Sequence, residues 1–354
     1  MEPVTHFLTG ACLARTGFNR RTAYATLAMT LAAEAPDIDV FWGFRGPVAG
    51  FEHHRGITHT FLGAPFVALA VLVVVWLWHR TRSKPPLIPP RWAFLWLLCL
   101  LAVLSHIFLD WTNNYGVRPF FPFNPHWYSL DIAFILEPVI FAALLTALIV
   151  PSIFGLADRE IGADKPRFRG RGWAIAAMVI IGIDLGVRAV EHHRALRIIR
   201  NTRFGDQTML RVGAEPYPVD PFHWFAIVET PGYYQTGLAD TRSETVDTGD
   251  QDNVIFKPPV TPAVIAAKRS WLGRVYLDWA RFPLVTDRGH ADLVASDELA
   301  PQPTDTAVEF RDLRFAYSFL PRNKSRASAA LTAWVYVTPA GAIDAMVMNN
   351  RLQH

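Results

Sequence analysis

Residues 53–78 read HHRGITHTFLGAPFVALAVLVVVWLW, a cluster of ionisable residues joined directly to an uncharged apolar run. The cluster, 53–60, holds three histidines and an arginine, and the run from 61 to 78 carries no charge. A helix of about 20 apolar residues crosses the hydrocarbon core of a bilayer. The stretch therefore predicts a membrane span with ionisable side chains at its mouth.

Apolar segments of similar length recur along the first half of the chain. Four are long enough to span a bilayer, at residues 61–78, 92–109, 132–150 and 173–190. Two shorter ones, 4–17 and 22–35, come first, and at about 1.5 Å per residue they suit short or re-entrant helices. The 354 residues are 51% hydrophobic with a net charge of +3, which does not favour nucleic acid as a partner.

Basic residues in the loops predict how the spans are oriented. They gather in the turn between the two short helices, in the loop 79–91 and in the loop 157–172, and are Arg15, Arg20, Arg21, Arg80, Arg82, Lys84, Arg91, Arg159, Lys165, Arg167, Arg169 and Arg171. The intervening loop, 111–128, has only Arg118. Because basic loops stay in the cytoplasm, the fourth span then leaves the C-terminal part outside it.

The C-terminal part has a different pattern. Short stretches rich in aromatic and β-branched residues predict antiparallel strands, namely HWFAIVET, GYYQTGLADT, DNVIFKP, VEFRDLRFAY, AALTAWVYV and AIDAMVMNN. The segment 262–282 has helical periodicity, with Ile265, Trp271, Leu272, Val275 and Trp279 on one side. The predicted fold is mainly α, a polytopic transmembrane helical bundle (1–192) followed by a small extramembrane, β-rich α+β domain (193–354).

The clearest ligand pair is in LSHIFLDW, 104–111. His106 and Asp110 are four residues apart, so a helix stacks them on one face about 6 Å apart. They can share a metal ion, or the carboxylate can orient the histidine from behind. A structural hydrogen bond at the helix end is the alternative.

Two other motifs carry further candidate ligands. In AAEAPDIDVFW, Asp37 and Asp39 follow an apolar helix whose C-terminus disfavours negative charge, so a nearby cation would explain them. In HHRGITHT, a spacing of five keeps His54 and His59 off one helix face, which puts His54 on the approach and His59 in the first turn of the span.

The predicted topology brings these residues to one level of the membrane. That level holds His6, Asp37, Asp39, His54 to His59, His106 to Asp110, and Asp131. Ionisable groups at such depth are costly and are usually paired or functional. The nitrogen and oxygen donors suit zinc first, with manganese or iron as alternatives, and one or two ions. Arg55 suits an anionic oxygen of a substrate.

The ordered set of motifs resembles the YdjM-like family of predicted bacterial inner-membrane metal-dependent hydrolases. The matching positions are His6, Asp37, Asp39, His54, Arg55, His59, His106, Asp110 and Gly116. Thr60 stands where serine is usual, and Glu34 where a small or apolar residue is expected. The family is distantly similar to zinc-dependent phospholipase C and the zinc single-strand nucleases. The resemblance implies that His106 and Asp110 hold metal, with His6, His59 and one aspartate of PDID.

We therefore expect a bacterial inner-membrane, metal-dependent hydrolase of a phosphoester in a lipid or envelope metabolite. The expected ligands are His6, Asp37, His59, His106, Asp110 and Asp131, and the expected catalytic residues are Arg55, Asp39 and His54. The expected partners are the lipid bilayer and a lipid-like or small phosphoester substrate, with no nucleic acid. A transporter for protons or divalent ions is one alternative. A non-enzymatic protein with a structural metal and a partner-binding C-terminal domain is the other.

Overall fold

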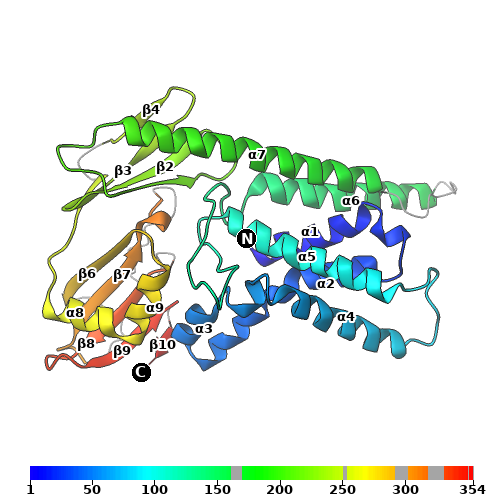
Figure 1. Ribbon diagram of the computed structural model, residues 1–354, viewed down its shortest axis with the longest axis horizontal. Helices are drawn as coiled ribbons and strands as arrows, with labels where there is room; N and C mark the ends of the chain where they lie inside the picture. Colours follow the sequence, from blue (N-terminus) through cyan, green and yellow to red (C-terminus); the bar gives the residue numbers. More distant parts are fainter. Residues whose placement is uncertain (161–169, 250–252, 292–301, 318–330, 350, 354) are drawn as a thin grey trace. The chain divides into compact units, whose positions relative to one another are not determined.

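The computed structural model describes the whole chain apart from residues 161–169, 250–252, 292–301, 318–330, 350 and 354 (Figure 1). The predicted cytoplasmic residues Lys165, Arg167 and Arg169 lie outside the described part. The chain divides into two compact units. The first comprises Met1–Asp39, Arg55–Arg194 and Pro216–His223, and the second comprises Val40–His54, Ala195–Glu215 and Trp224–His354.

The first half of the chain is helical. Its elements are α1 (Pro3–Arg15), η1 (Phe18–Arg20), α2 (Ala25–Glu34), η2 (Ala35–Arg45), α3 (Pro47–His53), η3 (Ile57–His59), α4 (Ala64–Arg80), α5 (Trp92–Thr112), α6 (Pro138–Glu160) and α7 (Arg171–Asn201). Three candidate membrane spans are found in the described residues, in α5, α6 and α7. The segments Pro47–His59 and Ala64–Arg80 form a fourth if this pair, bent by 85°, counts as one span. The predicted transmembrane bundle is thus confirmed.

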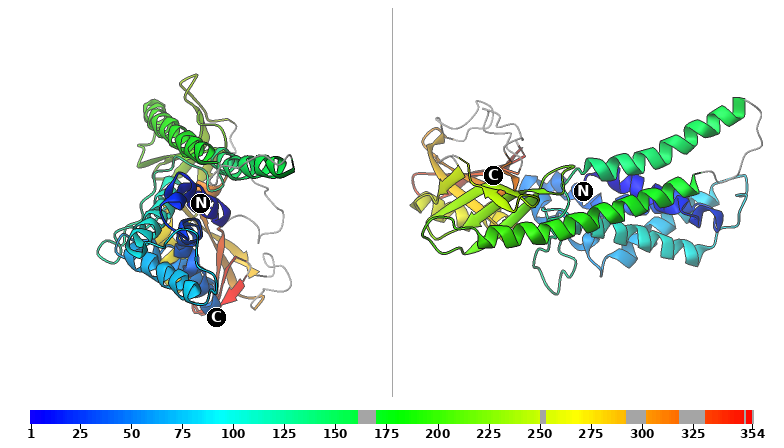
Figure 2. Two further views of the ribbon diagram at one scale, coloured as in Figure 1. Left: turned by 90° about the vertical axis from the view of Figure 1, so that its right-hand side faces the viewer. Right: turned by 90° about the horizontal axis from the view of Figure 1, so that it is seen from above.

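Close packing of α1 on α2 depends on one glycine. A Cβ added to Gly10 would lie 2.4 Å from the carbonyl oxygen of Met29, so only glycine lets the two backbones approach this closely. Small buried residues recur in the core that α1, α2, α4 and α5 share, including Ala28, Ala32 and Ala102. Small residues at helix contacts are typical of membrane bundles, where van der Waals packing holds the helices together. Beside this core, α4 and α5 lie side by side (Figure 2).

The start of α6 differs from the prediction. A span was predicted from Ile132, but the helix begins at Pro138. The backbone amides of Ile132 and Ala133 donate to the carbonyl of Thr112, at 2.9 and 3.0 Å, so this segment runs along the end of α5 instead. Pro138 suits the first turn of a helix because its missing N–H needs no partner there.

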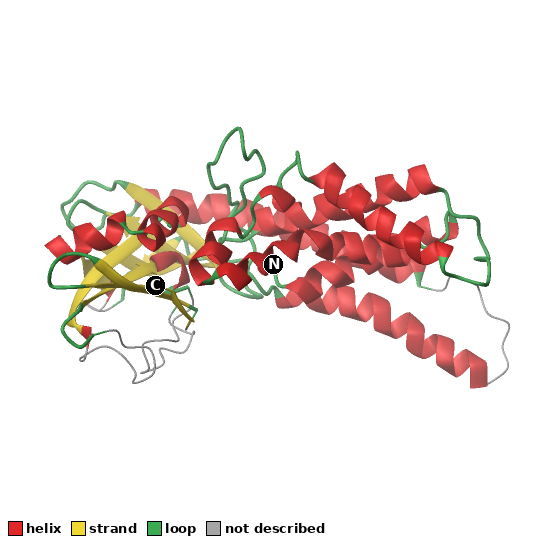
Figure 3. Cartoon of the chain, turned by 90° about the horizontal axis from the view of Figure 1, so that it is seen from below, coloured by secondary structure: helices red, strands yellow, loops and turns green. Residues whose placement is uncertain are grey.

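The strands all lie in the C-terminal part (Figure 3). One sheet has the order β1-β2-β3-β4, with β5 also paired to β3, and the other has the order β10-β9-β8-β7-β6. The strands are β1 (Arg211–Pro216), β2 (His223–Glu229), β3 (Tyr233–Asp240), β4 (Thr245–Asp247), β5 (Val254–Phe256), β6 (Pro283–His290), β7 (Thr306–Asp312), β8 (Ala333–Val337), β9 (Ile343–Met348) and β10 (Arg351–Gln353). The predicted antiparallel, β-rich character is confirmed, while β1, β4, β6 and β10 were not predicted.

The single helix predicted at 262–282 is two helices, α8 (Pro262–Arg269) and α9 (Trp271–Trp279). Ser270 separates them, and its hydroxyl accepts a hydrogen bond from the amide of Gly273, 3.0 Å away, as the N-cap of α9. The break changes the buried face. Val264 and Ala267 are buried in α8, whereas Ile265, which the periodicity placed on one side with Leu272, is 43% exposed.

Candidate metal centre

Four ionisable side chains from three separate segments converge in the first unit. Asp37 comes from η2, His59 from η3, and His106 and Asp110 from the last two turns of α5. One donor atom of each lies within 4.8 Å of the donor atoms of the other three. His59, His106 and Asp110 are buried, and the Asp37 side chain is 22% exposed. The predicted ligands Asp37, His59, His106 and Asp110 thus lie together.

Hydrogen bonds at the back of each imidazole decide which ring nitrogen faces the centre. His106 Nδ1 lies 2.7 Å from the carbonyl oxygen of Ala33, which can only accept, so this nitrogen carries the proton. His59 Nδ1 lies 3.2 Å from Asp39 Oδ2 and 3.2 Å from the Thr58 hydroxyl, and the ionised carboxylate favours a proton on this nitrogen. With both Nδ1 atoms protonated, the Nε2 atoms are bare in the neutral rings. A carboxylate or carbonyl behind a histidine is the usual support of a metal ligand.

The two bare nitrogens face one another. His59 Nε2 and His106 Nε2 are 3.0 Å apart, and two lone pairs at that distance in a buried site need a cation or a proton between them. Asp37 Oδ1 lies 3.3 Å from His59 Nε2 and 3.5 Å from His106 Nε2. Asp110 Oδ2 lies 3.6 and 3.4 Å from the same two atoms. These carboxylates supply negative charge on two sides.

The donor spacings fit a small divalent ion. Zinc bound at about 2.0–2.1 Å in tetrahedral geometry holds its ligand atoms roughly 3.3–3.4 Å apart. The five nitrogen–nitrogen and nitrogen–oxygen separations in the cluster run from 3.0 to 3.6 Å. Burial raises the pKa of Asp37, but hydrogen bonds from His106 and His59, which need protons on their Nε2 atoms, outweigh burial and hold that pKa well below its ordinary value. A metal ion between the Nε2 atoms would replace those protons and keep Asp37 as a carboxylate, which is the form that binds metal.

Arg55 supports the cluster from the side. Its NH2 group donates to Asp110 Oδ1 at 2.8 Å, and its NH1 group donates to the carbonyl of Gly116 at 2.8 Å. The guanidinium also lies 4.7 Å from the ring centre of Tyr115. Its backbone is in the left-handed region, at φ +51°, and its amide donates to Asp39 Oδ2 at 2.7 Å. The structure thus gives Arg55 a role in holding Asp110, and its predicted catalytic role stays a prediction.

His6 lies beside the four donors. Its ring stacks on His106 with 3.7 Å between ring centres, and its Nε2 is 3.3 Å from Asp110 Oδ1 without hydrogen-bond geometry. The amino group of Met1 pairs with the same Asp110 oxygen. Both ring nitrogens of His6 lack a hydrogen bond in the described part of the chain, although the ring is buried. An unsatisfied buried imidazole suits a ligand, and that assignment remains a prediction.

Three other predicted residues take different places. Asp39 stands behind His59, as described above. His54 is the C-cap of α3, and Asp131, with φ +54°, lies in the segment that runs along the end of α5. Neither belongs to the group of four described donors, so their predicted roles remain predictions. Sequence reasoning missed the carbonyl of Ala33, which has no side-chain signal, and Asn113, whose Oδ1 accepts from Arg55 at 3.3 Å.

Comparison with known proteins agrees with this arrangement. The family described as the YdjM inner membrane protein matches residues 1–195, which include every donor of the cluster. The chain belongs to the YdjM inner membrane protein family. It is a membrane protein with a buried Asp-His-His-Asp cluster able to hold a metal ion.

One relative of this YdjM family member is the uncharacterized protein YfhP of Bacillus subtilis (strain 168). The two are 28% identical over 158 residues, which cover 42% of this chain and 46% of YfhP. The chain thus spans about half the length of the curated relative it matches. No solved structure matches the chain.

Proposed function

We propose that this protein is a membrane-embedded, metal-dependent hydrolase that acts on a phosphoester of a lipid or envelope metabolite. The observation that supports the proposal most is the pair of bare imidazole nitrogens, His59 Nε2 and His106 Nε2, 3.0 Å apart between two carboxylates. A divalent ion held there would supply a Lewis acid that activates water and polarises a phosphoryl oxygen.

The donors, the groups behind them and Arg55 would then have different roles. His59, His106, Asp37 and Asp110 hold the ion. Asp39 keeps His59 in the tautomer that binds metal, and the Ala33 carbonyl does the same for His106. Arg55 fixes Asp110 and places a permanent positive charge beside the site, which favours an anionic substrate. The bilayer around the helices supplies lipid substrates at the depth of the site.

The exposure of the four donor side chains favours one side of the site for substrate access. Of the four donors, Asp37 alone is not buried, since 22% of its side chain is exposed while those of His59, His106 and Asp110 are at most 1% exposed. A phosphoester would approach from the side of Asp37. We expect exchange of Asp37 for glutamate to change substrate turnover more than metal retention.

The test begins with metal content. Protein purified in detergent is analysed by plasma mass spectrometry, comparing wild type with His106→Ala and Asp110→Ala. The matched controls are His193→Ala and Asp206→Ala, which remove the same side chains from exposed positions. We expect stoichiometric zinc or manganese in wild type and both controls, and loss of metal in the two cluster variants. Wild type without metal after reconstitution would overturn the proposal.

Activity is tested next on the metal-loaded protein. Release of nitrophenolate from bis(4-nitrophenyl) phosphate is expected in wild type and His193→Ala, and its loss is expected in His106→Ala. A protein that holds stoichiometric metal but cleaves neither this ester nor a short-chain phospholipid is not a phosphoesterase.

A purely structural metal is the second candidate, and the number of donors favours it. Structural zinc sites use four protein ligands, whereas catalytic sites keep a position open for water. The cluster offers four donors, with His6 as a fifth group alongside. X-ray absorption on the zinc protein separates the candidates, because a water ligand supports the hydrolase and four protein donors alone support the structural ion.

A further inference from the structure

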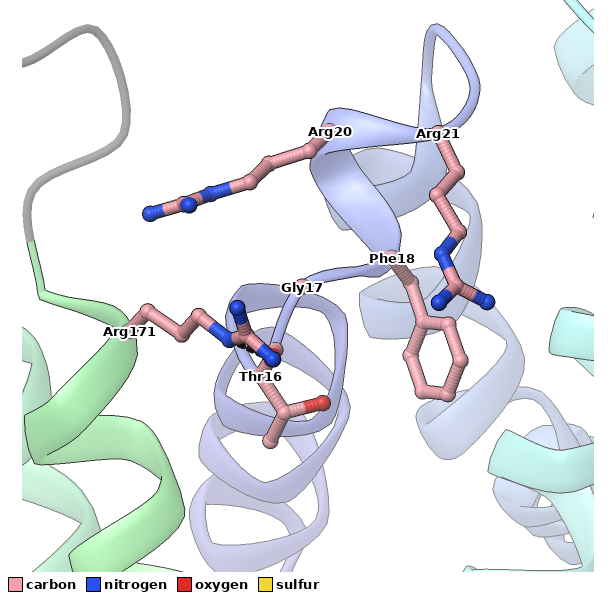
Figure 4. A pocket seen from close by; sticks show the side chains of 6 residues that line it. All are labelled: Thr16, Gly17, Phe18, Arg20, Arg21 and Arg171. Atoms are coloured by element: carbon pink, nitrogen blue, oxygen red, sulfur yellow. Dashed lines mark hydrogen bonds between the residues drawn. The ribbon is translucent and has the colours of Figure 1, made fainter.

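A second polar site lies at the other end of α1. Where α1 ends, a cavity of about 320 Å³ opens between the turn that follows it and the first residue of α7 (Figure 4). Its lining residues are Thr16, Gly17, Phe18, Arg20, Arg21 and Arg171. His6 and Thr16 are ten residues apart, which is about 15 Å along a helix. The cavity is therefore distinct from the metal centre.

The chain builds this cavity with a specific contact. Gly17, at φ +142°, turns the chain away after α1 into η1. Arg171 Nε donates to the carbonyl of Thr16 at 2.8 Å, which ties the start of α7 to the end of α1. Figure 4 shows the Arg171 side chain directed at Thr16 and the Arg20 side chain reaching from the turn toward the side of α7. Arg21 lies on the side of the Phe18 ring.

The charge of the cavity is strongly positive. Three of its six lining residues are arginines, and none of these six is acidic. An anion that enters the cavity would be attracted by these positive charges. The planar guanidinium matches the paired oxygens of a phosphate, and two arginines can bind one phosphate from two sides. The shape and charge thus suit a phosphate group.

The cavity also lies at the level expected for lipid head groups. The candidate span of α7 starts at Arg171, one of the lining residues. At this end of the bundle, Tyr24 packs against Trp78, and its hydroxyl lies 2.8 Å from His79 Nδ1. Trp78 and Trp173, close to the ends of α4 and α7, are 43% and 46% exposed. Exposed tryptophans at helix ends mark the interface between the bilayer and water.

We propose that this cavity binds a phosphate group carried by an anionic phospholipid head group. Basic pockets between membrane helices recognise such head groups. The same chemistry would accept a free phosphate, and the experiment below distinguishes the two sources. Binding here would hold the end of α1 against α7, because the ligand contacts side chains from both.

Native mass spectrometry of the full-length protein in detergent is the test. The probes are dihexanoylphosphatidylglycerol, dihexanoylphosphatidylcholine and inorganic phosphate, each titrated against wild type. The test variant is Arg20→Gln/Arg21→Gln, since both side chains are exposed and Arg171 keeps its bond to Thr16. The matched control is Arg80→Gln/Arg82→Gln, which removes the same charge from exposed positions in and just after the last turn of α4.

We expect wild type and the control to bind the phosphatidylglycerol probe, and the test variant to bind it about twenty-five-fold more weakly, at roughly fivefold per arginine. If wild type binds the phosphatidylcholine probe more weakly than the phosphatidylglycerol probe, the result supports an anionic lipid as the source. If wild type binds inorganic phosphate as tightly as the phosphatidylglycerol probe, and the test variant loses this binding, the result supports the phosphate site with a soluble ligand. Equal losses in the test and control variants, or no binding of any probe, would overturn the proposal.

Discussion

The Nε2 atoms of His59 and His106 face each other at 3.0 Å while the Nδ1 atom of each ring is already engaged. Neutral imidazoles so placed bring two lone pairs together, and the buried surroundings offer little water to separate them. Only a shared proton or a bound cation makes the contact favourable. The contacts behind the rings therefore matter as much for metal binding as the ligands themselves.

Asp39→Asn should weaken metal binding without unfolding the protein. Asp39 contacts His59 Nδ1 at 3.2 Å and accepts from the amide of Arg55 at 2.7 Å. An amide at this position can present its NH2 group to the imidazole and stabilise the wrong tautomer. Loss of such a partner costs about 10–100-fold in metal affinity. Competition with a chromophoric chelator measures the affinity, with Asp206→Asn as the control, and equal affinities in the two variants would refute the role of Asp39.

Arg55→Ala should destabilise the metal-free protein more than the metal-loaded one. It removes one of the two cationic groups that pair with the buried Asp110 carboxylate, the other being the Met1 amino group, and breaking a buried ion pair costs about 3–5 kcal/mol. A bound metal ion would compensate the same carboxylate and reduce the loss. Thermal unfolding is measured with and without zinc. Arg194→Ala, which breaks a surface pair with Glu191, should cost under about 1 kcal/mol in both states. An equal loss for Arg55→Ala with and without zinc would contradict the assignment of Asp110 as a ligand.

Local spacing predicted the pair His106 and Asp110, whereas Asp37 and His59 were predicted from the topology of the spans and the family resemblance. His106 and Asp110 are four apart on a helix, and the helix brings them to one face whatever the rest of the chain does. The position of Arg55 was beyond such reasoning. Arg55 contacts the Gly116 carbonyl, both residues have a positive φ, +51° and +89°, and the segments that carry them are far apart in sequence.

Element boundaries likewise depend on contacts between distant segments, which local sequence patterns do not predict. The apolar run from Ile132 predicts a span, but its amides are satisfied by Thr112 at the end of α5, a contact between distant segments. In the C-terminal part, the helical pattern continues across Ser270, yet the cap on Gly273 starts a new helix there. Added bulk at Gly273 would meet the carbonyl of Ala267 at 2.1 Å, so this glycine allows the sharp turn. Periodicity does not report such close approaches.

A carboxylate in the C-terminal part should make stability depend on pH. Glu229 is buried, lies 2.7 Å from Lys257 Nζ and pairs with Arg211. Burial raises its pKa, but hydrogen bonds from Arg211 and Lys257 outweigh burial and lower it. A carboxyl whose pKa is lowered on folding stabilises the protein above the unfolded pKa of about 4.3. That contribution is lost as the pH falls through the lower, folded value.

Glu229→Gln provides the measurement, because glutamine does not titrate. Melting temperatures followed by tryptophan fluorescence should show wild type more stable at pH 7, with the advantage shrinking below about pH 4. Glu244→Gln, at an exposed position, should match wild type throughout. If the stability advantage of wild type stays constant down to pH 3, the pKa of the Glu229 carboxyl is not lowered in the folded state.

One chain segment connects two parts of the metal centre. Val40–His54 lies between Asp39 and Arg55 in sequence but belongs to the second compact unit. There Phe51 packs edge-on against Trp279, with 5.2 Å between ring centres, and Glu52 accepts from Trp271 Nε1 at 2.9 Å. The C-terminal part thus contacts the end of the segment that precedes Arg55 and His59 in sequence.

Phe51→Ala should therefore lower both stability and metal affinity. Truncating a buried phenylalanine costs about 3–5 kcal/mol, and the loosened segment no longer presets Arg55 and His59 for binding. Phe256→Ala is the matched control, because its side chain is 74% exposed. Unfolding and chelator competition are measured on both variants. Reduced stability with unchanged metal affinity would mean that the first unit positions the centre by itself, whereas parallel losses would show that the C-terminal part helps to assemble the metal site.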